Sequence, residues 1–156
     1  MYFSTLRGIT IALRRPAALP LVLAVTLVAA GCASSEDAEF VDGYNAAVAP
    51  LSTTMSRLSS SPAGDPAAAS KSLDRVADRL VDVRADLAAL DPPDDAADEF
   101  DRMLGALKKG TKQVRAMARA TKDGDLQRLS KATADFSDTG TELVTTEQEL
   151  RTIVEN

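Results

Sequence analysis

The stretch ASKSLDRVADRLVDVRADLAAL, residues 69–90, decides the fold. Its apolar residues recur at alternating steps of four and three, which places them on one face of an α-helix. Asp65 and Pro66 supply an N-cap and a first-turn proline, and Pro92-Pro93 ends the helix because proline disfavours α geometry in the residue before it. The stripe consists of Ala69, Leu73, Val76, Leu80, Val83, Leu87 and Leu90.

Three further segments keep this spacing. The first contains Pro50, which predicts either a kink near Ala46 or two shorter helices. Asp123-Gly124-Asp125 separates the last two segments and supplies the turn and the next N-cap. The predicted stripes are Phe40, Tyr44, Val48, Leu51, Met55 and Leu58 in the first segment, Ala96, Phe100, Met103, Leu107, Gly110, Val114, Met117 and Thr121 in the third, and Leu126, Leu129, Thr133, Phe136, Gly140, Leu143, Glu147, Leu150 and Val154 in the fourth.

The arrangement of these helices follows from their spacing and their linkers. Steps that average about 3.5 residues favour helices packed nearly parallel to a common axis with left-handed supercoiling. Short linkers make consecutive helices antiparallel neighbours. The sequence therefore predicts an all-α, antiparallel up-down four-helix bundle.

Composition excludes several kinds of chemistry. The chain of 156 residues has no His and one Cys, so it has no His-containing metal site, no His-based nucleophile and no internal disulfide. It lacks the glycine-rich loops that bind phosphate. Its net charge of −5 disfavours general binding to nucleic acid. We expect no cofactor, no metal and no catalytic residues, and we predict that the protein is not an enzyme.

Residues 1–31 have the organisation of an export signal. Arg7, Arg14 and Arg15 precede an apolar run over residues 17–30, which is short for a membrane span of about 20 residues. The pair Arg14-Arg15 leaves twin-arginine export open. The small and polar residues 32–37 predict a tether, and residues 38–156 form the predicted bundle.

The run Val28-Ala29-Ala30-Gly31-Cys32 resembles the lipobox of bacterial lipoproteins, with Ala29 where that family usually has a larger aliphatic residue. The resemblance implies that Cys32 carries a diacylglycerol, that residues 1–31 are removed, and that the protein is anchored on the outer face of the cell membrane. Ordinary secretion is the alternative. Through Leu90-Asp91-Pro92-Pro93 and the turn over residues 122–126, the chain also resembles small helical lipoproteins of actinobacteria.

Charge is unevenly distributed in the predicted third helix. Removal of residues 1–31 takes away three Arg and no acid, so the net charge falls from −5 to −8, yet residues 102–122 contain no acid. Five cations follow the helical spacing one position from the apolar stripe. We name them the basic row: Lys108, Lys112, Arg115, Arg119 and Lys122.

Two interpretations of the basic row are open. The row pairs internally with Asp74 and Asp78 on the preceding helix, or it binds an anionic wall polymer or an acidic protein. A basic flank at the end away from Cys32 suits the second interpretation, because the predicted membrane-proximal end is acidic. The sequence thus predicts a non-enzymatic binding or assembly module of the cell envelope.

Other candidate features have simpler explanations. The acidic ladder Asp74, Asp78, Asp82 and Asp86 predicts a solvated helix face with ion pairs to Lys71, Arg75 and Arg79. Glu147 falls on an apolar stripe, but a small rotation would bury Thr146 instead. Two alternative functions remain: an oligomerising bundle joined through Leu104 and Val144, and a carrier of an apolar ligand in space left by Gly110 and Gly140.

Overall fold

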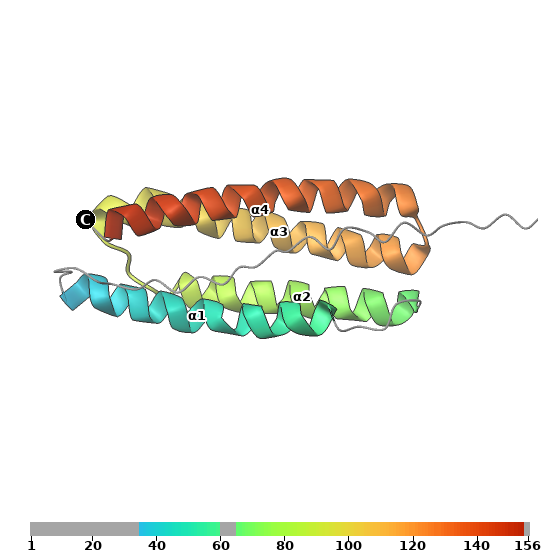
Figure 1. Ribbon diagram of the computed structural model, residues 1–156, viewed down its shortest axis with the longest axis horizontal. Helices are drawn as coiled ribbons and strands as arrows, with labels where there is room; N and C mark the ends of the chain where they lie inside the picture. The colour runs from blue at the N-terminus through green and yellow to red at the C-terminus, as the bar shows by residue number, and fades with distance from the viewer. Residues whose placement is uncertain (1–34, 60–64, 155–156) are drawn as a thin grey trace, which may run out of the picture.

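The computed structural model describes residues 35–59 and 65–154, and it confirms an all-α four-helix bundle over this part of the chain. The predicted signal segment and Cys32 lie outside the described residues. The helices are α1 (Ser35–Ser59), α2 (Pro66–Leu87), α3 (Ala97–Asp123) and α4 (Leu126–Val154), with a single 3-10 turn, η1 (Asp94–Ala96), before α3. Figure 1 shows α1 beside α2 and α3 beside α4 in two layers of long helices.

Contacts between neighbouring helices run in opposite order along the sequence. Arg102 meets Glu149 and Lys109 meets Glu142, so residue numbers rise along α3 as they fall along α4. Consecutive helices accordingly point in opposite directions in Figure 1. Helix α3 packs extensively against both α2 and α4, whereas α1 packs chiefly against α2.

The helix ends are set by the residues expected to set them. The Asp65 carboxylate accepts hydrogen bonds from the backbone N–H groups of Ala67 and Ala68, at 2.9 and 3.2 Å. Gly124 adopts a φ of 68°, a left-handed conformation that only glycine takes without strain. The Asp125 carboxylate then accepts from the N–H of Arg128 at 2.9 Å and caps α4.

Three boundaries or positions differ from the prediction. Helix α1 begins at Ser35, inside the predicted tether, because Glu36 and Asp37 favour a helix N-terminus. It also continues through Pro50 as one helix, so of the two alternatives predicted for this segment the one with two shorter helices is wrong. Ala46, whose carbonyl loses its usual donor at Pro50, is exposed and can be hydrated. Leu126 is 77% exposed because it starts α4 beyond the packed part of the bundle.

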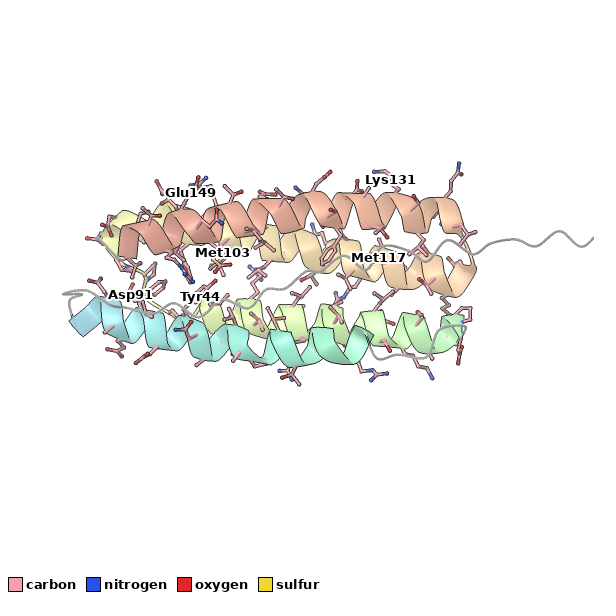
Figure 2. All side chains as sticks on the ribbon, viewed as in Figure 1. Tyr44, Asp91, Met103, Met117, Lys131 and Glu149 are labelled. Carbon is pink, nitrogen blue, oxygen red and sulfur yellow. The ribbon has the colours of Figure 1, made fainter. Side chains whose placement is uncertain are left out.

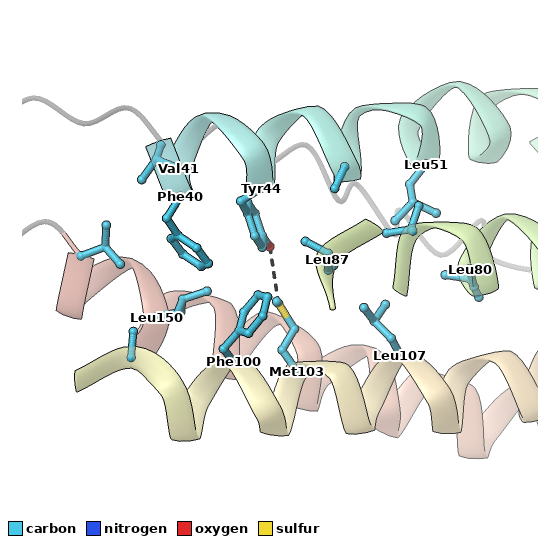
Figure 3. Packing of buried hydrophobic residues seen from close by; sticks show 14 of the residues in the cluster. Phe40, Val41, Tyr44, Leu51, Leu80, Leu87, Phe100, Met103, Leu107 and Leu150 are labelled. Carbon is cyan, nitrogen blue, oxygen red and sulfur yellow. Dashed lines mark hydrogen bonds between the residues drawn. The ribbon is translucent and has the colours of Figure 1, made fainter. Parts of the chain in front are cut away.

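The core is built from the predicted stripes. Leu87 and Leu150 have no exposed surface, and the Phe100 ring lies edge-on to the Phe40 ring with centroids 5.3 Å apart. Figure 3 shows these side chains meeting between the helices. At Gly110 an added Cβ would be in ordinary van der Waals contact with the Phe136 ring at 3.6 Å, so side chains of α4 already occupy the space beside this glycine that a ligand was expected to use. The side chains of Met55 and Leu58 lie outside the described residues.

Burial predicts a sharp contrast between two leucines. Leu87→Ala removes a fully buried side chain and should lower the free energy of unfolding by about 2–5 kcal/mol. Leu126→Ala should change it by less than about 0.5 kcal/mol. Urea unfolding followed by circular dichroism measures both, and equal effects of the two substitutions would contradict this packing.

Candidate functional site

The basic row is exposed along its whole length. All five side chains lie on the surface of α3. The row follows the flank of α3 that adjoins α2, since Arg115 in its middle meets Asp78 of α2 at 3.3 Å. Both partners of this ion pair are about half exposed or more, so its contribution to stability is small.

Most of the row lacks an internal ion pair. Within residues 35–59 and 65–154, Arg115 is the one member that pairs with a carboxylate, and Lys108, Lys112, Arg119 and Lys122 have none within 4.0 Å. The expectation of internal pairing holds for Asp78 and fails for Asp74. Four positive charges are therefore presented to solvent along one side of the helix.

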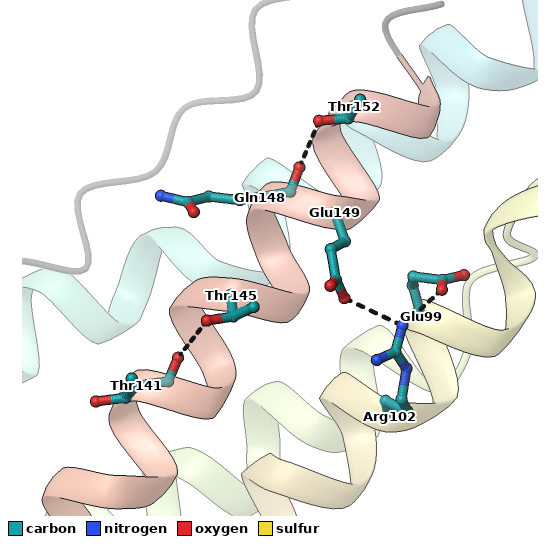
Figure 4. Close-up of polar contacts among 7 residues, drawn as sticks. All are labelled: Glu99, Arg102, Thr141, Thr145, Gln148, Glu149 and Thr152. Atoms are coloured by element: carbon teal, nitrogen blue, oxygen red, sulfur yellow. Dashed lines mark hydrogen bonds and ion pairs between the residues drawn. The ribbon is translucent and has the colours of Figure 1, made fainter.

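The opposite flank of α3 is neutralised. Arg102 contacts Glu99 at 2.6 Å and Glu149 of α4 at 3.1 Å, as Figure 4 shows. One further step along the same seam, Lys109 meets Glu142 at 3.1 Å. The cations of α3 thus divide into a set paired with α4 and the largely unpaired basic row.

The acidic ladder on α2 forms a solvated face, as expected. Its four carboxylates are exposed. Of the three predicted local pairs, Arg79–Asp82 forms at 3.6 Å. Asp78 instead reaches Arg115, and the Arg75 guanidinium donates to the Lys71 carbonyl at 3.3 Å. No group of three potential metal ligands gathers anywhere in the described part of the chain.

Acidic residues gather at the end of the bundle where α1 begins. A pocket of about 620 Å³ lies there between the start of α1 and the α2–η1 connection. Its acidic lining residues are Asp37, Glu39, Asp91 and Asp94. Figure 2 places Asp91 and Glu149 toward this end and Met117 and Lys131 toward the other. The bundle is therefore acidic at one end, and the row on α3 extends to the opposite end.

A polar group interrupts the apolar core. The structure buries both Thr146 and Glu147, with Glu147 only 7% exposed. Glu147 borders a cavity of about 20 Å³ lined by side chains from all four helices, a volume that suits a single water molecule. In the same cavity the Tyr44 hydroxyl donates to the Met103 sulfur at 3.6 Å (Figure 3).

The electrostatics of this cavity follow from burial. Burial raises the pKa of the Glu147 carboxyl above its ordinary value of 4.5, and Arg151 partly opposes this shift. Burial, with a smaller effect of Glu147, also raises the pKa of Tyr44. Hydrolysis by a pair of carboxylates needs one carboxyl group as the acid and another as the base or nucleophile. The residues that line this cavity include no carboxylate besides Glu147, so they do not support that mechanism.

Comparison with models of protein families, with curated proteins and with solved structures gives no match. Over the described helices, none has the length and apolar character that a membrane crossing requires.

The raised pKa of Glu147 makes stability depend on pH. The folded state binds the Glu147 proton more tightly than the unfolded state, so this stabilisation is complete below pH 4.5 and is lost as pH rises through the folded-state pKa. Glu147→Gln should therefore raise the free energy of unfolding by about 1 kcal/mol at pH 7 and by less at pH 4. Urea unfolding at both values tests this, with the exposed Glu142→Gln as the control. A loss of stability at pH 7 would contradict the assignment.

Proposed function

We propose that the protein is a lipid-anchored, extracytoplasmic and non-enzymatic module that binds an anionic partner along the basic row. One observation carries the proposal: four of the five row cations are exposed and lack a carboxylate partner among the described residues. In a chain with a net charge of −5, such a line of free positive charge is not needed to balance neighbouring acids. Its remaining role is attraction of negative charge from outside the molecule.

The anchor gives this surface a direction. Cys32 precedes α1 by a few residues, so a lipid there would hold the acidic end of the bundle toward the membrane. Anionic headgroups repel that end. Helix α3 is 27 residues long and starts at this acidic end, so at 1.5 Å per residue the far end of the row lies about 40 Å outward. The proposal thus combines attachment at one end with recognition toward the other.

The structure offers less to the alternative functions. For an oligomerising bundle, Leu104 is half-buried against the core, and the exposed Val144 and Leu126 lie 18 positions apart on α4, about 27 Å at 1.5 Å per residue. For an apolar carrier, the central cavity has room for a water molecule rather than an acyl chain. Neither alternative has an observation that favours it over the basic row.

The anchor has a direct test. The membrane-extracted protein should have the intact mass of residues 32–156 plus a diacylglycerol and any amino-terminal acyl chain. Cys32→Ser should move the protein from the membrane fraction into the soluble fraction, because stable anchoring needs two or more acyl chains. An intact mass corresponding to an unmodified Cys32 would refute lipidation.

Anion binding has a test with a matched control. Lys112→Glu with Arg119→Glu breaks no ion pair among the described residues and should weaken binding to anionic polymer by a factor of about ten or more. Arg128→Glu with Lys131→Glu changes the net charge equally on α4, breaks only the exposed local ion pairs with Asp125 and Asp135, and should weaken binding much less. Calorimetric titration with poly(glycerol phosphate) and with poly-L-glutamate measures both variants. Binding of neither polymer would refute the proposed function.

A further inference from the structure

We infer that the basic row binds a single flexible phosphodiester chain laid lengthwise along α3, an inference that rests on the proposed function. The row is straight and regular. Its members recur at steps of four and three residues, so a cation stands about every 5 Å along the helix. From Lys108 to Lys122 the row is about 21 Å long. A linear array of this kind matches a linear array of negative charges.

The surroundings of the row limit the width of the ligand. On one side Asp78 of α2 contacts Arg115, and it belongs to an exposed ladder of four carboxylates. On the other side Glu142 of α4 lies level with the start of the row, where Lys109 neutralises it. A broad acidic protein surface would cover the exposed ladder of α2 together with the row and would be repelled by its carboxylates. A chain one residue wide can contact the cations without covering the ladder.

The row also lacks the apolar anchors of a protein interface. Such interfaces depend on a few large aromatic or aliphatic side chains at their centre. Of the described residues, the exposed large hydrophobics are Val81, Leu126 and Val144, and none is on α3. Affinity at this surface must then come from charge, through release of the counterions that a polyanion carries.

The chemistry of the row suits phosphate and provides nothing for bases. Lysine ammonium groups and arginine guanidinium groups bind phosphate oxygens, as they also bind carboxylates. Stacking on bases requires exposed aromatic rings, but Phe40, Tyr44 and Phe100 are buried and Phe136 packs against Gly110. The row should therefore recognise backbone phosphates alone, so an isolated oligonucleotide is a probe for the same phosphate contacts, although the net charge of −5 disfavours general binding to nucleic acid.

The test varies chain length, salt and chemistry of the polyanion. Oligomers of poly(glycerol phosphate) with three, six and twelve phosphates are titrated into the lipid-anchored protein in detergent. Thymidine oligonucleotides with matched numbers of phosphates and poly-L-glutamate of matched charge serve as the other arms. We expect affinity to rise with length until the oligomer spans the row, similar affinities for the two phosphodiesters, and weaker binding of polyglutamate.

The salt dependence of the binding constant measures how many cations of the row contact the ligand. With four free cations, log K should fall with log salt concentration with a slope of about −3, and K112E with R119E should reduce it to about −1.4. Asp78→Asn should release Arg115 and steepen the slope by about 0.7. Retained helical circular dichroism in each variant excludes unfolding as the cause.

Three results would overturn the inference. These are affinity that is independent of chain length, a preference for polyglutamate, and binding of thymidine oligonucleotides without binding of poly(glycerol phosphate). A preference for polyglutamate would leave the proposed function standing, because an anionic partner would still bind the row. Absence of binding in every arm would remove both proposals.

Discussion

Burial of the apolar stripe of α3 between α2 and α4 is the constraint on which the rest of the structure depends. Phe100, Met103 and Val114 on this stripe are almost fully buried. Once that face is fixed, the two flanks of α3 are fixed as well, because side chains one position away on the helix must point to one neighbour or the other. Packing of apolar residues thus determines where the charges of α3 are displayed.

The positions of the carboxylates on α2 and α4 then decide which cations of α3 are neutralised. Helix α4 presents Glu142 and Glu149 one heptad apart, and these match Lys109 and Arg102 across the antiparallel seam. Helix α2 mixes Lys71 and Arg75 with its carboxylates on exposed positions, and only Asp78 reaches the basic row. A helix with cations on both flanks therefore has one flank paired with α4 and one flank whose cations are mostly unpaired among the described residues.

Periodicity and caps predicted most of the fold, because both are local properties of the sequence. The stripe around Leu87, the cap at Asp65 and the turn at Gly124 needed no knowledge of other helices. The partner of Asp78 was not predictable in this way, since Arg75 and Arg115 are both within reach in principle and the choice depends on the rotation of α2 against α3. For the same reason the sequence did not decide between Thr146 and Glu147, whereas the packed bundle buries both.

Glu147 shows that the core of this bundle accommodates a buried carboxyl group. Its carboxyl lies where α1 packs over the other helices, yet the cavity it borders also contains the Tyr44 hydroxyl, whose acceptor is the weakly accepting Met103 sulfur. A water molecule of the size this cavity admits would give both groups a stronger partner and lower the cost of burying them. The cavity is lined by Val83 and Leu87 of α2 and by Met103 and Leu107 of α3 as well as by residues of α1 and α4, so the cost of the buried carboxyl falls on the packing of all four helices. The basic row lies on the exposed surface of α3 and does not line this cavity, so the buried polar pair and the displayed charges are separate features of the same bundle.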